Sequence, residues 1–240
     1  ACCYWFHVNG LETGYSQHVA EPRTKVVALE TCLMKTKEKI LLKSLELFNQ
    51  FGEPNVTTLD VATELEISPG NLYYHFKGKD EIIDVLFQRF ESEIFDLQMH
   101  RVESDAVLLD LWTYLQFSFE VMAEYLFLFR DVADLLSRYP KLHRKFNGLL
   151  AAQRKTLSLL ANGLVEEGSL TASNSELSHL VEHMTMTMSF WLNYQRVQAH
   201  DMHAFEPDLA DCAYQVVAQL LPYLEHETRL EVKAIASEYL

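Results

Sequence analysis

The sequence is poor in residues that break helices and in residues that cross-link chains, with 8 glycines, 6 prolines and 4 cysteines among 240 residues. Cys2, Cys3 and Cys32 lie near the start and the fourth is Cys212. This distribution is no disulfide framework, and a reduced cytoplasmic setting fits it best. No apolar run approaches the roughly 20 residues that a membrane helix needs, so we expect no membrane partner.

Hydrophobic residues make up 49% of the chain, enough for a sizeable core. They recur at three- and four-residue spacing, and no long stretch alternates polar and apolar residues as a strand does. This periodicity predicts an all-α protein.

Three segments of different character follow one another along the chain. Residues 1–33 show no sustained periodicity and no signal-peptide core, whereas a helical pattern, MKTKEKILLKSLELF, starts at Met34. We therefore expect a leader or extension outside the native fold at 1–33, with a genuine N-terminal arm as the alternative. A three-helix domain with a helix-turn-helix is expected at 34–80, and a larger helical domain at 81–240.

The net charge of −14, taken alone, argues against nucleic-acid binding, because phosphate contacts need Lys and Arg. The charge is unevenly distributed, however. Between Met34 and Lys79 six bases balance six acids: Lys35, Lys37, Lys39, Lys43, Lys77 and Lys79 against Glu38, Glu46, Glu53, Asp60, Glu64 and Glu66. The acidity lies mostly elsewhere, so the distribution permits DNA binding by this segment.

The segment from Thr57 to Lys79 predicts a helix-turn-helix. Thr57 and Asp60 form a capping-box pattern that opens one helix. Ser68 followed by Pro69 opens a short second one, since a hydroxyl N-cap and a proline at the first position both suit a helix start. Reading DNA needs such a short helix, braced by the preceding one, with its N-terminal end at the base edges.

The polar and aromatic residues of this segment remain available for DNA once its apolar face is buried. Asn71 can pair with adenine or phosphate, and Gly70 lets the backbone come close to DNA. Tyr73 and His75 offer a hydroxyl and an imidazole, and Lys79 can bind phosphate. The predicted DNA-binding residues are Thr57, Ser68, Gly70, Asn71, Tyr73, Tyr74, His75 and Lys79.

The tetracycline-repressor (TetR) family of bacterial regulators has a helix-turn-helix that resembles LDVATELEISPGNLYYHFKGKDEII. The pattern that carries the resemblance is Ser68-x-Gly70-x-Leu72-Tyr73-x-His75-Phe76-x-x-Lys79. The resemblance implies the family's DNA-contact roles for Thr57, Gly70, Asn71, Tyr73, His75 and Lys79. Two positions depart from the family's pattern. Glu66 stands where a turn glycine is usual and would have to adopt a left-handed conformation, and Leu59 stands where a basic residue is common.

The resemblance also implies a function for residues 81–240. Family members are transcription regulators, most often repressors, that act without a cofactor or enzymatic activity and bind palindromic double-stranded DNA as homodimers. The pairing helices are expected at 174–199 and 207–225, with an interface of Leu180, Met184, Trp191, Val217, Leu220 and Leu221. A small hydrophobic effector is expected among Trp112, Phe119, Met122, Phe129, Arg130, Met184 and Met188. The alternative is that these are ordinary core residues, with Arg130 paired to Asp131 or Asp134.

Two further interpretations remain open from the sequence. His179, Glu182 and His183 match the inverted zincin motif H-x-x-E-H, which would make the protein a zinc hydrolase. That motif is short, arises by chance and lies where a dimer helix is expected. In the second interpretation the protein is a DNA-binding dimer without a small-molecule ligand, regulated by a protein partner.

Overall fold

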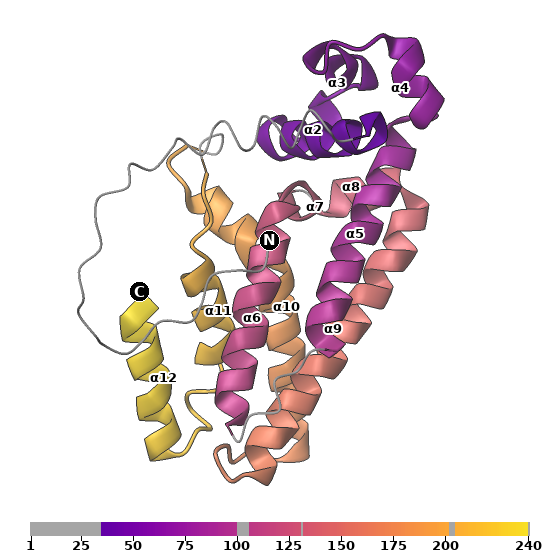
Figure 1. Ribbon diagram of the computed structural model, residues 1–240. Helices are drawn as coiled ribbons and strands as arrows, with labels where there is room; N and C mark the ends of the chain where they lie inside the picture. The colour runs from indigo at the N-terminus through magenta and orange to yellow at the C-terminus, as the bar shows by residue number, and fades with distance from the viewer. Residues whose placement is uncertain (1–34, 100–105, 131, 202–204, 240) are drawn as a thin grey trace, which may run out of the picture. The chain divides into compact units, whose positions relative to one another are not determined.

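The computed structural model describes residues 35–99, 106–130, 132–201 and 205–239 (Figure 1). The leader predicted at 1–33 lies outside these residues. Within them the chain folds into helices, in the order α2 Thr36–Phe51, η1 Glu53–Asn55, α3 Thr58–Glu64, α4 Pro69–His75, α5 Lys79–Met99, α6 Val107–Glu124, α7 Phe127–Arg130, α8 Val132–Arg138, α9 Pro140–Glu166, α10 Asn174–Gln198, α11 Leu209–Ala218 and α12 His226–Tyr239. Strand-like pairing in this part of the chain is limited to one isolated bridge, between Leu170 and Leu224. The all-α prediction is confirmed.

The helices of the N-terminal part start and stop at the predicted signals. α2 ends at Phe51, after which Gly52 adopts a left-handed φ of 84°. The predicted capping box opens α3: the Thr57 hydroxyl accepts a hydrogen bond from Asp60 N at 3.2 Å, and the Asp60 carboxylate accepts one from Thr57 N at 2.7 Å. Ser68 caps α4, its hydroxyl accepting from Asn71 N at 3.2 Å.

A small core holds the helix-turn-helix together. Val61 and Ala62 of α3 and Leu72 of α4 are buried against α2, where Leu41 and Phe48 are buried in turn. Burying a side chain the size of leucine or phenylalanine stabilises by about 1.5–3 kcal/mol. The two short helices therefore owe their stability to this packing and to their caps rather than to their own length.

The long helices form the rest of the fold. α5 and α9 run side by side, α6 packs against both, and α10 packs against α9 and α11 (Figure 1). Aromatic side chains join these elements: the Phe90 ring lies 5.5 Å from Phe129 and 5.9 Å from Phe87, and Phe146 lies 6.2 Å from Phe129. None of the helices in the described ranges combines the length and hydropathy needed to cross a bilayer.

The C-terminal end differs from the prediction. The helix expected over 207–225 ends at Ala218, and a further helix, α12, follows it. Pro222 lacks an N–H and disfavours helix continuation. Backbone hydrogen bonds from Thr171 N to Tyr223 O (2.9 Å) and from Glu225 N to Ser169 O (3.0 Å) also draw this stretch into an extended pairing.

Candidate DNA-binding site

The α4 helix presents most of its side chains to solvent. Only Leu72 is buried, and Phe76, which follows the helix, is buried as well. Tyr73 is 53% exposed and Tyr74 is 85% exposed, the most open large side chain on the helix. Ser68, Gly70 and Asn71 are also exposed, whereas His75 is half-buried with its ring edge-on to Tyr74 at 5.1 Å.

α3 braces α4 through a contact between side chains. The Thr58 hydroxyl lies 3.2 Å from the Tyr73 hydroxyl. Thr57 itself is exposed, but both its N–H and its hydroxyl donate to the Asp60 carboxylate at 2.7 Å. These hydrogen bonds lower the pKa of Asp60, which therefore stays ionised at the start of α3. A phosphate approaching Thr57 would meet the Asp60 charge as well as the helix start.

The fold itself does not require a glycine at position 70. A Cβ built on it would meet only the Ser68 hydroxyl, at 3.9 Å, which is ordinary contact distance. Its φ is not in the left-handed region. The absence of a side chain here is therefore explained better by close approach of another molecule than by the fold.

The turn between α3 and α4 contains the strained residue expected from the sequence. Glu66 has a φ of 53°, and it is the one left-handed non-glycine residue in the described part of the chain. Its N–H donates to Thr63 O at 3.0 Å, and Ile67 N donates to Ala62 O at 3.0 Å. Both N–H groups of the turn are therefore hydrogen-bonded, although the backbone of Glu66 is strained. Leu59, the other departure from the family's pattern, is 58% exposed on α3.

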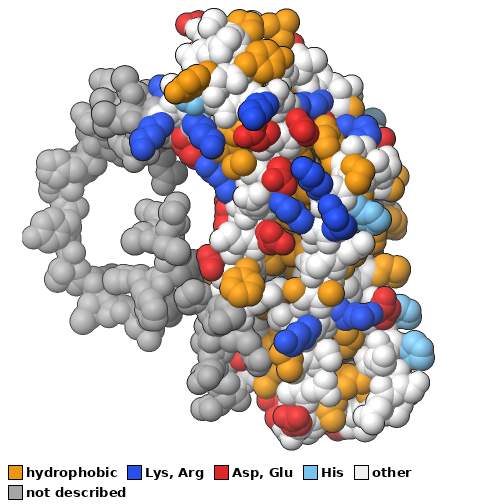
Figure 2. Space-filling view, turned by 90° about the vertical axis from the view of Figure 1, so that its right-hand side faces the viewer, with side chains coloured by type: hydrophobic (Ala, Val, Ile, Leu, Met, Phe, Trp, Pro, Cys, Tyr) orange, Lys and Arg blue, Asp and Glu red, His pale blue; other side chains and the backbone are white. Residues whose placement is uncertain are grey.

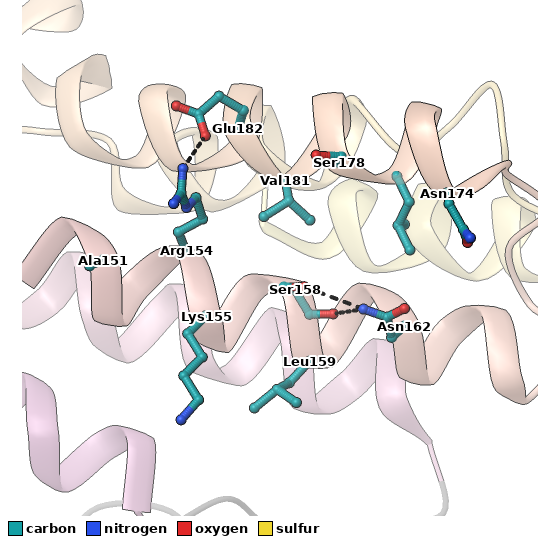
Figure 3. Close-up of a pocket in the computed structure, with 11 residues that line it drawn as sticks. Ala151, Arg154, Lys155, Ser158, Leu159, Asn162, Asn174, Ser178, Val181 and Glu182 are labelled. Atoms are coloured by element: carbon teal, nitrogen blue, oxygen red, sulfur yellow. Dashed lines mark hydrogen bonds and ion pairs between the residues drawn. The ribbon is translucent and has the colours of Figure 1, made fainter.

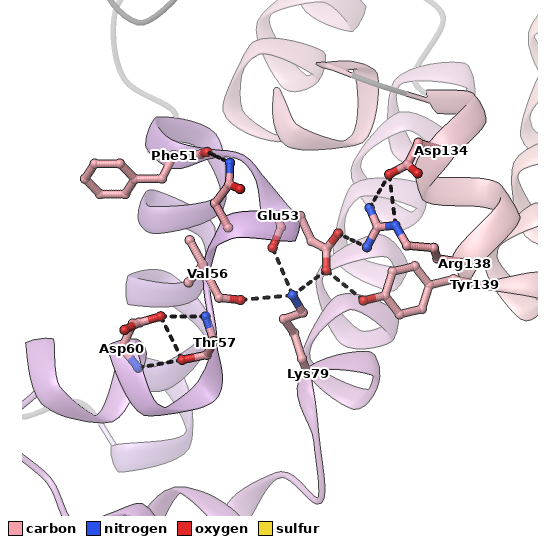
Figure 4. A network of polar contacts seen from close by, with 10 residues as sticks. Phe51, Glu53, Val56, Thr57, Asp60, Lys79, Asp134, Arg138 and Tyr139 are labelled. Carbon is pink, nitrogen blue, oxygen red and sulfur yellow. Dashed lines mark hydrogen bonds and ion pairs between the residues drawn. The ribbon is translucent and has the colours of Figure 1, made fainter.

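Lys79 lies at the end of the helix-turn-helix and points inward (Figure 4). Its ammonium donates to Glu53 O and Val56 O, both at 2.9 Å, and pairs with the Glu53 carboxylate at 2.8 Å. An ammonium has three donors, and all three have acceptors here. As the molecule stands, Lys79 therefore joins α5 to η1 and has no donor left for phosphate.

Glu53 is the centre of this network. Its side chain is 2% exposed and accepts hydrogen bonds from Lys79, from Arg138 at 2.5 Å and from the Tyr139 hydroxyl at 2.7 Å. Burial alone would raise the pKa of Glu53, but the bonds from Lys79, Tyr139 and Arg138 outweigh it and hold the pKa below its usual value. Asp134 supports the network by pairing with Arg138 at 2.7 Å. The network ties the helix-turn-helix to α8 and α9.

The sequence analysis missed this network. Glu53 lies 26 residues before Lys79 and 86 before Tyr139, and no local pattern relates them. The one usable signal was an acidic residue directly after Gly52, at the end of α2.

The surface beside the helix-turn-helix carries charges of both signs. Figure 2 shows the side on which α5 and α9 lie, where basic and acidic side chains are interspersed, while hydrophobic side chains gather at the top. Several of these charges are paired, as in Lys145 with Asp84 at 2.5 Å. This side of α5 and α9 therefore shows no extended area of a single charge sign.

The residues predicted to line a ligand site fall into two groups. Six are at most 5% exposed and belong to the core: Trp112, Phe119, Met122, Phe129, Met184 and Met188. Arg130 lies apart from them, with its guanidinium donating to Asn49 O (3.4 Å) and Gln50 O (3.3 Å) at the end of α2. Of its two suggested partners, Asp134 pairs with Arg138 instead, and Asp131 lies outside the described residues.

Four of the residues predicted for the dimer interface are buried within the chain itself. Leu180, Met184, Val217 and Leu220 are 0–7% exposed, so their surface is not available to a second copy. Leu221 and Trp191 are half-buried, and the Trp191 indole N–H donates to the α11 carboxylate of Asp211 at 2.9 Å. The predicted stripe thus holds α10 and α11 within the protomer. The apolar side chains that α10 does expose are Met186, Phe190, Tyr194 and Val197.

The zincin-like motif lies on the outer side of α10. Figure 3 shows the neighbouring groove between α9 and α10, of about 650 Å³. Glu182, the would-be general base, pairs across it with Arg154 at 3.0 Å. A group of three or more side chains placed to hold a metal ion is not found among the described residues. Within the described ranges, these side chains do not form the three-ligand site that a zinc hydrolase would need.

Two protein-family models match the chain. One, for bacterial regulatory proteins of the tetR family, matches residues 40–86, and the other, for a bacterial transcriptional repressor of the TetR type, matches residues 87–232. The first covers the helix-turn-helix, and the second covers most of the remaining helices. Both describe regulators rather than enzymes.

Solved structures and a curated relative agree with these matches. A TetR-family transcriptional regulator from Marinobacter aquaeolei is 32% identical, with a TM-score of 0.75 over 86% of this chain and 99% of that one. A ketosteroid transcriptional regulator of Mycobacterium tuberculosis is 20% identical and shares the fold, with a TM-score of 0.62 over 81% and 97% of the two chains. The biofilm-operon negative regulator IcaR of Staphylococcus epidermidis is 24% identical over 107 residues, 45% of this chain and 51% of that protein. The match thus spans about half the length of this curated relative. With the first of these structures and both family models in agreement, the chain belongs to the TetR family of bacterial transcriptional regulators.

Proposed function

We propose that this protein is a dimeric repressor that leaves a palindromic operator when a small hydrophobic ligand binds. The DNA-binding part of this proposal is supported by the exposed face of α4. Asn71, Tyr73 and Tyr74 stand exposed on a helix whose opposite side is anchored by Leu72, and Gly70 is free of any internal role. A short helix held rigidly from behind, with polar and aromatic groups in front, suits the major groove.

The second copy would pack on the outer face of α9 and α10. Met186, Phe190, Tyr194 and Val197 follow helical spacing on α10 and are each at least 47% exposed, and Leu159 of α9 is similarly open. An exposed apolar stripe of this kind normally marks an interaction surface. A dimer would place two α4 helices on one operator, and a two-fold protein matches a palindrome.

The ligand would enter the core between α6 and α9. The Gln153 amide nitrogen is buried there and has no hydrogen-bond partner in the part of the chain that the structure describes, and the buried Tyr114 hydroxyl lies near the hydroxyls of Ser118 and Thr156. Unpartnered polar atoms in a core are uncommon and destabilising. A hydrophobic molecule with one or two polar groups would satisfy them while packing against neighbours such as Phe119.

Selection of bound fragments from genomic DNA tests the proposal. Wild-type protein should enrich a palindromic site, and Tyr74→Ala, which removes the most exposed side chain of α4, should not enrich it. A control is Phe95→Ala, an aromatic side chain on α5 that is also exposed, at 57%. Recovery of no palindrome with folded wild-type protein would refute the DNA-binding proposal.

Release by a ligand is a separate part of the proposal. Gln153→Leu removes the unpartnered amide nitrogen and should raise thermal stability while abolishing the response to an effector found by screening. If instead no hydrophobic compound changes operator affinity, regulation through a protein partner becomes the better explanation.

A further inference from the structure

Leu59 is an exposed hydrophobic residue in the first turn of α3. Its side chain is 58% exposed and lies outside the small core to which Val61 and Ala62 of the same helix belong. The start of the helix does not depend on it either, because the capping box is formed by Thr57 and Asp60. The fold therefore does not explain a leucine at this position.

Leu59 lies close to the point where α3 meets the exposed face of α4. The hydroxyl of Thr58, one residue earlier, is 3.2 Å from the Tyr73 hydroxyl. Tyr73 is 53% exposed, and Tyr74 beside it in the sequence is 85% exposed. Figure 2 shows hydrophobic side chains gathered at the top of the molecule, the end at which Figure 1 places α3 and α4. Leu59 and the two tyrosines therefore belong to one exposed end of the DNA-binding domain, and apolar groups gathered in this way mark an interaction surface.

The side chains of α3 are poorly suited to binding DNA phosphates. The helix contains no lysine or arginine, and its acids Asp60 and Glu64 are exposed. A hydroxyl has a single proton to donate, and those of Thr57 and Thr63 are donated inside the protein, to the Asp60 carboxylate at 2.7 Å and to Leu59 O at 2.9 Å. We therefore expect an attractive contact between α3 and DNA to involve the apolar side chain of Leu59.

The apolar group that double-stranded DNA presents in its major groove is the C5 methyl of thymine. A leucine side chain against this methyl removes two apolar surfaces from water, which is favourable. Against cytosine the same side chain would cover the N4 donor without accepting a hydrogen bond from it, and burying an unpartnered donor is unfavourable. A leucine at the groove therefore distinguishes thymine from cytosine without forming a hydrogen bond.

We propose that Leu59 contacts the methyl group of one thymine in each half of the operator and selects thymine at that position. The proposal rests on the proposed function, because it needs α4 of the same protomer to lie in the major groove. α3 meets α4 at Thr58, so Leu59 reaches a base to one side of those that α4 contacts. Each protomer therefore recognises a longer sequence than α4 alone would read.

Replacing thymine with deoxyuridine in the operator tests this contact, because the substitution removes the methyl group and keeps the hydrogen bonds of the base pair. The operator is the sequence that the full-length protein enriches from genomic DNA. Each of its thymines is replaced in turn, together with the symmetry-related one, and affinity is measured by fluorescence anisotropy. Loss of the methyl contact should weaken binding of the wild-type protein by about fourfold in each half-site. Leu59→Ala should bind more weakly than wild type to the unmodified operator, and at one thymine position it should be insensitive to the replacement.

Two further variants make the test specific to the leucine side chain. Leu109→Ala is the matched control, since Leu109 is 52% exposed in the first turn of α6, outside the DNA-binding domain. This variant should respond to deoxyuridine as the wild type does at every position. Leu59→Gln replaces the apolar group with an amide that can pair with adenine. When the selection is repeated with this variant, the preference for thymine should disappear at the position that Leu59→Ala identifies and remain at the others.

The outcomes separate this contact from operator binding as a whole. If the wild-type protein enriches a palindrome but Leu59→Ala keeps the wild-type response to deoxyuridine at every thymine, the contact is refuted and the proposed function stands. An enriched site without any methyl-sensitive thymine also overturns the contact. If the folded wild-type protein enriches no site, the proposed function fails and the contact fails with it. Circular dichroism shows whether the variants are folded, and the selection with Leu59→Gln decides the question if Leu59→Ala is not.

Discussion

Replacing Glu53 with glutamine should reveal how strongly the helix-turn-helix is fastened to the rest of the protein. The glutamine side chain has nearly the same shape and keeps one oxygen acceptor for Lys79 or Tyr139. It loses the negative charge that compensates Lys79 and Arg138, and it turns an N–H₂ group toward one of these donors. The substitution therefore removes the charge from the network without opening a cavity.

The expected loss of stability follows from the burial of the partners. Breaking a buried ion pair costs about 3–5 kcal/mol. The Lys79 and Arg138 side chains are 23% and 34% exposed, so water can partly solvate them once Glu53 is neutral, and we expect about 2–3 kcal/mol. For a chain of this size each kcal/mol lowers Tm by about 2–4 °C. Glu46→Gln is the control: its carboxylate is 58% exposed beside Lys43, and its loss should change stability by less than about 0.5 kcal/mol.

Urea unfolding followed by circular dichroism from pH 7 to pH 3.5 makes the test specific to charge. The folded pKa of Glu53 lies below its ordinary value of 4.5, so its contribution to stability is complete above that value and is lost as the pH falls through the folded pKa. The difference between wild type and Glu53→Gln should therefore be constant near neutral pH and shrink below about pH 4.5. Equal losses for Glu53→Gln and Glu46→Gln, or a difference that does not change with pH, would refute the reasoning.

Three other substitutions have defined outcomes. Glu66→Gly should raise the free energy of unfolding by about 0.5–1 kcal/mol, because glycine relieves the left-handed φ; a loss of stability in urea unfolding would contradict this. Tyr74→Ala should leave stability within about 0.5 kcal/mol of wild type but weaken operator binding by about 1–3 kcal/mol in a fluorescence anisotropy titration; unchanged affinity would exclude a DNA contact. Phe190→Glu should shift the protein from dimer to monomer in sedimentation velocity, whereas Phe95→Glu, on α5, should not; a dimer that survives Phe190→Glu would exclude the α10 stripe.

The parts of the fold that could be predicted depend on interactions close in sequence. The caps at Thr57 and Ser68 act over three residues, and the structure places both as expected. The left-handed φ of Glu66 was expected from the resemblance to the TetR family, in which a glycine is usual at this position of the turn. By contrast, the Glu53 network joins residues up to 86 apart, and its formation depends on how α8 and α9 pack against η1, which no short pattern encodes.

The dimer residues show a different limit of sequence reasoning. An apolar stripe on a helix has the same periodicity whether it faces its own core or a second copy. Met184 and Met186 are two residues apart on α10, yet the first is fully buried and the second is 57% exposed. The positions of α9 and α11 decide which of the two apolar stripes of α10 is buried inside the protomer. A helix with apolar residues on two sides should therefore be expected to serve both purposes.

The contrast between Lys77 and Lys79 gives a last test of how this nearly neutral domain binds DNA. The Lys79 ammonium has three internal acceptors at 2.8–2.9 Å, whereas Lys77 is exposed in the turn after α4. Each lysine that neutralises a phosphate steepens the dependence of log affinity on log salt by about 0.9. In a dimer, Lys77→Gln should therefore reduce that slope by about 1.8, while Lys79→Gln should lower stability and leave the slope unchanged. Lys155→Gln, exposed on α9, should alter neither. A slope reduced by Lys79→Gln and not by Lys77→Gln would mean that Lys79 leaves Glu53 for phosphate when DNA binds. Operator binding itself would then break the contact between Lys79 and Glu53.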